Sequence, residues 1–93
     1  MPKQVRAHAI ITGKVQGVFF RMETQCAARN HNVSGWVRNK IDGSVEAVFE
    51  GAEADVSATL AWCQEGPPHA MVRNVDITWQ EYTGEFEIFE VTY

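Results

Sequence analysis

Residues 34–51, which read SGWVRNKIDGSVEAVFEG, contain a strong signal for two paired strands. Asp42-Gly43 lies between two runs in which apolar and polar residues alternate, and an Asp-Gly pair in that setting is a strong signal for a β-hairpin. We therefore predict antiparallel strands at residues 34–40 and 44–50. One face of the second strand is expected to line the core, and its members are Val45, Ala47 and Phe49.

A first helix is predicted over residues 21–31, before the hairpin, because this segment contains good helix formers and neither Gly nor Pro. Met22 and Cys26 are four residues apart with Ala27 beside them, so we expect these side chains to form the stripe that faces the core. Asn30 to Asn32 is the expected end of the helix, since Asn tolerates the left-handed backbone conformation.

A second helix is predicted over residues 53–65, directly after the hairpin. Gly66-Pro67-Pro68 follows it and ends it sharply, because proline cannot continue a helix. The apolar stripe of this helix has the spacing i, i+4, i+7 and consists of Val56, Leu60 and Cys63.

Further strands are predicted at both ends of the chain. Residues 5–12 place Val5, Ala7, Ala9 and Ile11 on one face, while residues 72–82 and 86–92 form two strands joined near Thr83-Gly84. The order β-α-β-β-α-β, with one further short strand, is typical of the α+β, ferredoxin-like split βαβ fold. In that fold two antiparallel helices lie on one face of an antiparallel sheet. Residues 1–93 contain no repeat or linker and are expected to form a single domain.

Composition excludes several classes of function. The chain has 8 basic and 12 acidic residues and a net charge of −4, spread along the sequence, which disfavours a nucleic-acid partner. No apolar run approaches the length of a membrane span, and the first residues lack the pattern of a signal peptide. We therefore expect a cytoplasmic protein with neither a nucleic acid nor a membrane as partner.

The two cysteines are far apart and form no CxxC pair, so they indicate neither a zinc site nor a redox motif. We expect Cys26 and Cys63 to be small buried side chains in a reducing compartment. A disulfide stays open as an alternative, since antiparallel helices would bring these two positions together.

A candidate anion site lies at residues 13–21, GKVQGVFFR, where the first strand gives way to the first helix. Gly13 and Gly17 permit backbone conformations in which consecutive N–H groups converge, and the helix start adds partial positive charge. Arg21 supplies a planar, permanently charged fork that can bind two phosphate oxygens. Taken alone, the same stretch is also compatible with an ordinary glycine-rich turn and a solvated arginine.

Asn39 is the second candidate, near the end of the strand that precedes Asp42-Gly43. Strand alternation puts it on the same face as Val37, and on the opposite face from Trp36, Arg38 and Lys40. In isolation, an Asn here is usually a turn residue bonded to its own backbone. The split βαβ topology favours a role in chemistry, because it makes the first and second strands parallel and lets their ends converge on the glycine-rich loop.

The residues at these positions resemble the signatures of the acylphosphatase family. Residues 13–21 are similar to its pattern Gly-x-Val-Gln-Gly-Val-x-Phe-Arg, and further matches follow in order along nearly the whole chain. These are Gly35-Trp36-Val37-Arg38-Asn39, Asp42-Gly43, Val45-Glu46-Ala47, and the Gly-Pro-x-x-Ala-x-Val pattern at Gly66, Pro67, Ala70 and Val72.

The resemblance implies hydrolysis of acyl phosphates to a carboxylate and inorganic phosphate, without a metal, a cofactor or a covalent intermediate. It assigns phosphate binding to Arg21 and the orientation of the attacking water to Asn39. It also implies that backbone amides cradle the phosphate, those of Val15, Gln16, Gly17, Val18, Phe19 and Phe20. We therefore expect a monomeric acylphosphatase, whose acyl substrate the sequence does not identify and for whose acyl part it shows no obvious pocket.

The chemistry that the residues offer agrees with this substrate class. The sequence contains no Ser/His/Asp arrangement, no pair of carboxylates on one helix face and no cluster of metal ligands. An acyl phosphate expels a carboxylate, whose conjugate acid has a pKa of about 4, so its hydrolysis needs no general acid. With a loose transition state, water needs positioning more than deprotonation.

Two rival interpretations stay open at this point. One is a related domain that binds or cleaves carbamoyl phosphate within a larger maturation protein. The other is a ferredoxin-like binding module, for RNA or for a metal. An RNA-binding module would need basic and aromatic residues where Glu46 and Glu50 stand, and a metal carrier would need a CxxC motif within residues 13–21.

Overall fold

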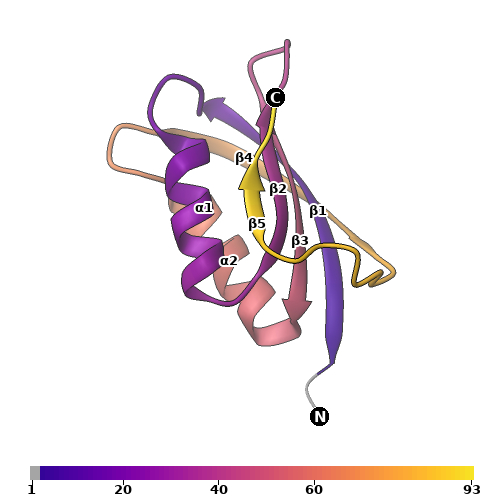
Figure 1. Cartoon of the computed structure of the whole chain (residues 1–93). Coiled ribbons are helices and arrows are strands. Elements are labelled where there is room, and N and C mark those ends of the chain that lie inside the picture. Colours follow the sequence, from indigo (N-terminus) through magenta and orange to yellow (C-terminus); the bar gives the residue numbers. More distant parts are fainter. Residues whose placement is uncertain (1–2) are drawn as a thin grey trace.

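The structure is a computed structural model and describes residues 3–93. Its elements are β1 (Gln4–Lys14), α1 (Phe20–Asn30), β2 (Ser34–Asn39), β3 (Val45–Ala52), α2 (Glu53–Glu65), β4 (Met71–Gln80) and β5 (Phe89–Val91). The two helices lie against one face of the sheet and leave the other face uncovered (Figure 1). The predicted element order and fold class are confirmed, with shifts of a few residues at the ends of the elements. No helix in the described part of the chain is long and apolar enough to cross a bilayer.

The sheet has the strand order β4-β1-β3-β2-β5. β3 is antiparallel to both of its neighbours, β1 and β2, so these two strands run in the same direction, as predicted. β4 is antiparallel to β1, but β5 pairs with β2 in parallel, so the prediction of an antiparallel sheet is wrong at this edge. The reason is that residues 81–88 cross one end of the sheet, from the edge at β4 to the opposite edge. The chain then turns back, so β5 runs in the opposite direction to β4 and in the same direction as β2.

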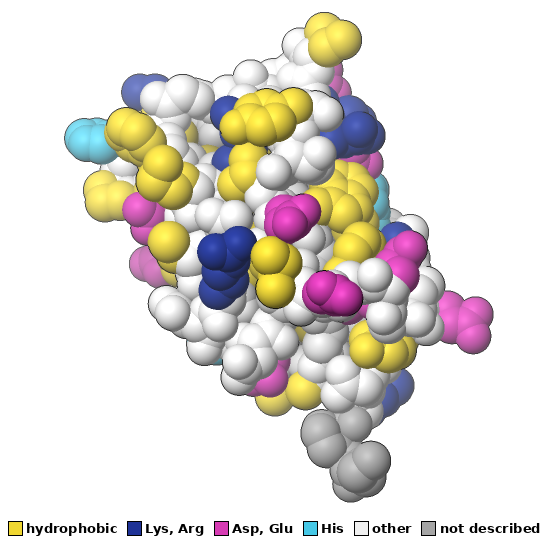
Figure 2. All heavy atoms as spheres, in the orientation of Figure 1, with side chains coloured by type: hydrophobic (Ala, Val, Ile, Leu, Met, Phe, Trp, Pro, Cys, Tyr) yellow, Lys and Arg dark blue, Asp and Glu magenta, His cyan; other side chains and the backbone are white. Residues whose placement is uncertain are grey.

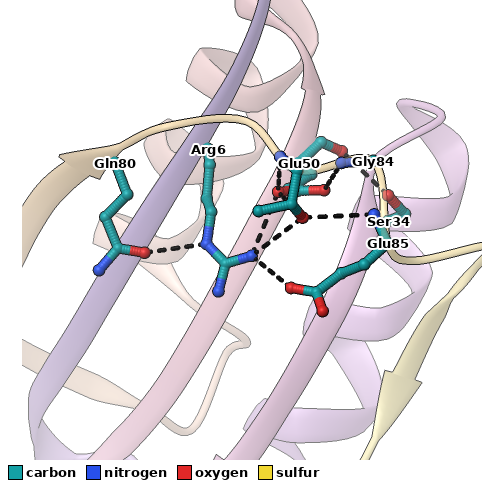
Figure 3. A network of polar contacts seen from close by, with 7 residues as sticks. Arg6, Ser34, Glu50, Gln80, Gly84 and Glu85 are labelled. Carbon is teal, nitrogen blue, oxygen red and sulfur yellow. Dashed lines mark hydrogen bonds and ion pairs between the residues drawn. The ribbon is translucent and has the colours of Figure 1, made fainter.

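A buried carboxylate holds this crossing segment in place (Figure 3). Glu50 on β3 is fully buried, and its Oε2 accepts hydrogen bonds of 2.9 Å from both the backbone N–H and the hydroxyl of Thr83. Its Oε1 accepts a 3.1 Å bond from the N–H of Gly84, and Arg6 on β1 forms an ion pair with Oε2 at 3.2 Å. Burial by itself would raise the pKa of Glu50, but the bonds from Thr83, Arg6 and Gly84 outweigh it and hold that pKa below its ordinary value of 4.5.

The core lies between the helices and the sheet. The predicted inward faces of β1, β3 and α2 are all buried, and they consist of Val5, Ala7, Ala9, Ile11, Val45, Ala47, Phe49, Val56, Leu60 and Cys63. The predicted stripe of α1 is wrong, because Met22 and Cys26 are exposed and the buried residues of this helix are Phe20, Thr24 and Ala28. Thr24 can be buried because its hydroxyl donates a 2.7 Å hydrogen bond to the carbonyl of Phe20.

The orientation of α1 also determines the exposure of Cys26, whereas Cys63 lies on α2. Cys63 is buried, as predicted, and burial raises the pKa of its thiol to about 12. Cys26 is exposed, so the expectation that both are buried is wrong for this residue. Both thiols are free, and within residues 3–93 they form no disulfide.

Candidate functional site

The structure brings Arg21 and Asn39 into one cleft, between the start of α1 and the end of β2. The cleft has a volume of about 360 Å³. It is lined by Val15, Gly17, Phe19, Phe20, Arg21, Met22, Gln25, Asn39, Val91 and Tyr93. Val15 directly follows β1 and Asn39 ends β2, and both line this cleft. The ends of the two strands therefore converge, as predicted.

The loop between β1 and α1 has the backbone that an anion cradle requires. Gly17 and Phe19 both adopt the left-handed conformation, with φ of 75° and 64°. Turns of this kind let successive N–H groups point into one concavity. In the described chain, no N–H group of residues 15–19 donates to the carbonyl of another residue, so these donors are free for a ligand. The loop leads directly into α1, whose first turn adds further unpaired N–H groups and partial positive charge.

Gly13 sets the direction in which the chain enters this loop. It has a φ of 123° and lies at a bulge in the pairing between β1 and β4. A Cβ at this position would collide with the backbone carbonyl of Met71 on the neighbouring strand. Only glycine fits such a close approach of two backbones.

Gln16 ties the loop to the turn between β2 and β3. Its Nε2 donates hydrogen bonds to the carbonyl oxygens of Lys40, at 2.7 Å, and Ser44, at 2.9 Å. These bonds hold the loop beside the end of β2, where Asn39 lies. The sequence motif assigns only the backbone of Gln16 to the cradle and gives no sign of this function of its side chain.

Asn39 is the last residue of β2, and its side chain contains an unpaired buried atom. Its Oδ1 is buried and has no hydrogen-bond partner in the structure. A buried acceptor without a partner is unusual, and such groups are often explained by a ligand or by catalysis. Arg38 points to the other side of the sheet, as predicted, where it pairs with Glu46 at 2.7 Å and lies over the ring of Trp36.

Arg21, in the first turn of α1, keeps its positive charge free for an anion. The ion pairs within residues 3–93 involve Arg6, His8 and Arg38 as the basic partners, and Arg21 takes part in none of them. Its guanidinium carbon lies 5.1 Å from the centre of the Tyr93 ring, an arrangement that attracts a cation to the ring face. Tyr93 thus supports Arg21 without neutralising it.

Four residues of the cleft were not predicted from the sequence: Met22, Gln25, Val91 and Tyr93. Val91 and Tyr93 reach the cleft only because β5 pairs with β2, which brings the end of the chain beside the turn between β2 and β3 (Figure 1). Met22 and Gln25 reach it because of the orientation of α1. The apolar periodicity of the helix was the only sequence signal for the orientation of these two side chains, and it wrongly placed Met22 in the core.

The described residues contain no group of three or more His, Cys, Asp and Glu side chains arranged to hold a metal ion. The lining side chains that carry charged or polar groups are those of Arg21, Gln25, Asn39 and Tyr93. The cleft therefore offers one fixed positive charge and free backbone donors together with side-chain amide and hydroxyl groups, which suits a small anion and a water molecule.

Comparison with known proteins places these features in a family. The family model described as Acylphosphatase matches residues 7–91. The chain is 50% identical to an acylphosphatase of Pelotomaculum thermopropionicum, over 97% of this chain and 98% of that protein. It is 51% identical to an acylphosphatase of Syntrophus aciditrophicus, over 95% of this chain and 92% of that one.

Solved structures agree with the sequence relatives. The acylphosphatase from Bacillus subtilis superposes with a TM-score of 0.92 at 30% identity, over 96% of this chain and 99% of that chain. The acylphosphatase from Coxiella burnetii gives a TM-score of 0.91 at 35% identity, over 96% and 93% of the two chains. A part of HypF, whose structure is described as phosphate- and nucleotide-bound, gives 0.86 at 25% identity and amounts to 12% of that chain.

Proposed function

Since the chain belongs to the acylphosphatase family, we propose that Arg21 and the loop amides bind the phosphate of an acyl phosphate while Asn39 orients the water that attacks it. Family membership makes the protein a hydrolase that splits the carboxyl–phosphate bond. The division of labour between Arg21 and Asn39 is our proposal. It is carried by one observation within residues 3–93: Asn39, whose buried Oδ1 has no hydrogen-bond partner, lines the same cleft as Arg21, which forms no ion pair.

Arg21 acts on the charge of the phosphoryl group. Its guanidinium can donate two parallel hydrogen bonds to phosphate oxygens, and the free N–H groups of residues 15–19 surround the remaining oxygens. In this proposal the loop amides need no rearrangement when substrate binds, because the left-handed turns at Gly17 and Phe19 already shape the loop. Preorganised donors of this kind stabilise charge without reorganising during the reaction.

Asn39 acts on the nucleophile. Its Oδ1 can accept a hydrogen bond from water and so direct an oxygen lone pair of that water toward the phosphorus. The amide is neutral, so it does not repel the phosphate as a carboxylate would. The water oxygen forms a bond to phosphorus while the bond between phosphorus and the acyl oxygen breaks, and the protons of the water end on the oxygens of the phosphate produced. The products are inorganic phosphate and a carboxylate, which leaves without protonation.

The domain organisation, oligomeric state, location and partners of the protein are also proposals. We propose that residues 1–93 work as a single domain and a monomer in the cytoplasm, with a small acyl phosphate as partner and neither nucleic acid nor membrane. One hydrophobic cluster joins both helices to the sheet, which supports a single folding unit. The balance of 12 acidic against 8 basic residues supports the lack of a nucleic-acid partner.

The test is a panel of acetyl, benzoyl and carbamoyl phosphate and one alkyl phosphate, each assayed with and without a metal chelator. We expect hydrolysis of acyl phosphates at the same rate in both conditions and almost none of the alkyl phosphate, whose alkoxide leaving group needs help that Arg21 and Asn39 do not provide. Activity that disappears with the chelator and returns with Mg²⁺ would overturn the mechanism. Activity confined to carbamoyl phosphate would favour the rival carbamoyl-phosphate domain.

A further inference from the structure

One wall of the cleft consists of large apolar side chains that the fold leaves in solvent. Phe19, Met22 and Tyr93 are 69%, 57% and 93% exposed, and all three line the cleft that contains Arg21 and Asn39. We call these three residues the apolar rim. The described chain has eight exposed large hydrophobic residues, and three of them share this one cleft. Figure 2 shows hydrophobic side chains next to Lys and Arg side chains at this end of the molecule.

Phe19 is held in a conformation that its own side chain disfavours. Among residues 3–93, it is the only residue with a positive φ that is neither Gly nor Asn. A left-handed backbone costs roughly 1–2 kcal/mol for a residue with a Cβ, and Asn tolerates it best. The ring does not recover this cost by burial, because most of its surface is exposed. Strained residues that packing does not explain cluster at ligand sites.

The cleft is also larger than a phosphate requires. Phosphate on Arg21 and the loop amides would occupy only a fraction of about 360 Å³. The acyl end of the substrate must continue from the phosphate into the remaining space, and the side chains that border this space are those of the apolar rim. We propose that the apolar rim is a subsite for the acyl group and favours aromatic acyl phosphates over acetyl phosphate. This inference rests on the proposed function.

The positive charge of Arg21 favours substrate, and not a second copy of the chain, as the occupant of the apolar rim. The guanidinium of Arg21 lies 5.1 Å from the ring centre of Tyr93, one of the rim residues, and has no acidic partner within residues 3–93. Pairing this surface with its own copy would bury two unpaired guanidinium groups, which is strongly unfavourable. An acyl phosphate instead brings an anion for Arg21 and an apolar group for the rim.

The experiment compares kcat/KM for benzoyl and acetyl phosphate in the native protein and in variants of the rim. Phe19→Asn removes the ring but keeps a residue that accepts the left-handed backbone, and Phe19→Ala provides a second truncation. Met22→Ala has a matched control in Met71→Ala, since Met71 is 72% exposed and lies outside the cleft. We expect the benzoyl-to-acetyl ratio to fall about three- to tenfold in both Phe19 variants, as for the loss of one aromatic pair. It should fall less in Met22→Ala and stay unchanged in Met71→Ala.

Binding without chemistry gives an independent readout. Phenylphosphonate and methylphosphonate share the phosphonate group, differ in their apolar group and are not hydrolysed, so the ratio of their competitive inhibition constants reports on the rim. Phe19→Asn should weaken inhibition by phenylphosphonate about three- to tenfold. Because Phe19→Asn keeps the backbone N–H of the cradle, inhibition by methylphosphonate and by inorganic phosphate should weaken less than inhibition by phenylphosphonate.

Three results would overturn the inference. The first is a benzoyl-to-acetyl ratio that does not change in either Phe19 variant, although acetyl phosphate is still hydrolysed. The second is an equal loss on both substrates together with an equal weakening of phosphate inhibition, which would show that the ring of Phe19 acts through the shape of the cradle and not on the acyl group. The third is a dimer in sedimentation experiments that Phe19→Asn dissociates, which would assign the rim to self-association. A native protein that hydrolyses neither acyl phosphate would refute the proposed function itself.

Discussion

Asn39→Ala is the substitution that tests the proposed site most directly, because activity and stability should respond differently. The side chain is expected to contact the attacking water and not the phosphate. Its Oδ1 is buried without a hydrogen-bond partner in the fold, so truncation breaks no hydrogen bond within the protein. We therefore expect a large loss of turnover without a loss of folding stability.

The two magnitudes follow from this geometry. Losing one positioned hydrogen-bonding group at a reacting centre typically costs about 10²- to 10³-fold in kcat, or roughly 3–4 kcal/mol. Leaving a buried acceptor unsatisfied costs about 1–3 kcal/mol, and Asn39→Ala removes that cost while losing little packing. The free energy of unfolding should thus stay level or rise by about 1 kcal/mol, which corresponds to a Tm increase of up to about 4–8 °C for a domain of this size.

The assay measures kcat with benzoyl phosphate, the inhibition constant of inorganic phosphate and the Tm of each variant. Asn39→Ala should keep a near-native inhibition constant, because Arg21 and the loop amides are unchanged. Asn39→Asp should be no better in turnover, since a carboxylate beside the phosphate repels it. Arg38→Ala is the control and should stay active, because Arg38 lies on the other side of the sheet and pairs with Glu46.

An Asn39→Ala protein with near-normal kcat and weakened phosphate inhibition would refute this reasoning. Asn39 would then be a ligand of the phosphate, and the water would have to be held by the backbone or by the substrate. A fall in Tm of 10 °C or more, corresponding to about 2 kcal/mol, would also contradict it, because it would show that the side chain of Asn39 supports the fold.

Two further predictions concern the anion site and the crossing segment. Inorganic phosphate at a hundredfold excess over its Kd should stabilise the native protein by about 2.7 kcal/mol. Arg21→Ala should lose this gain together with turnover, and equal stabilisation of the variant would place the anion elsewhere. Glu50→Gln should lower the unfolding free energy by about 2 kcal/mol at pH 7, because the buried carboxylate accepts bonds from Arg6 and Thr83. Since the pKa of Glu50 lies below 4.5 in the fold, its stabilisation is present above that pH and is lost as the pH falls further. The difference in Tm between native and Glu50→Gln proteins should therefore shrink on acidification, and a difference that is constant with pH would contradict the role of the charge.

Much of the fold could be predicted because its signals are local. Asp42-Gly43 marks the hairpin, Gly66-Pro67-Pro68 ends α2, and Asn32 has the left-handed φ of 58° expected after the end of α1. Each of these signals depends on backbone preferences of neighbouring residues. Strand alternation also predicted which faces of β1 and β3 are buried, since a period of two leaves only two choices.

The buried face of α1 could not be predicted in the same way. Apolar character favoured Met22 and Cys26, but the helix buries Thr24 and Ala28. Thr24 can be buried because its hydroxyl bonds to the carbonyl of Phe20 within the helix, which removes the cost of its polarity. Met22 is exposed and lines the cleft, where it belongs to the proposed acyl subsite.

The order of the elements, the glycine-rich loop and the family resemblance of the motifs could be predicted from the amino-acid sequence, because each depends on short stretches of the chain. That Arg21, Asn39 and Tyr93 share one cleft could be seen only in the folded protein. These three residues come from the start of α1, the end of β2 and the segment after β5, and no local preference relates them. Their meeting depends on the parallel pairing of β5 with β2 and on Glu50, which holds the crossing segment from the opposite end of β3. Such contacts join residues far apart in the chain, and only the packed sheet brings them together.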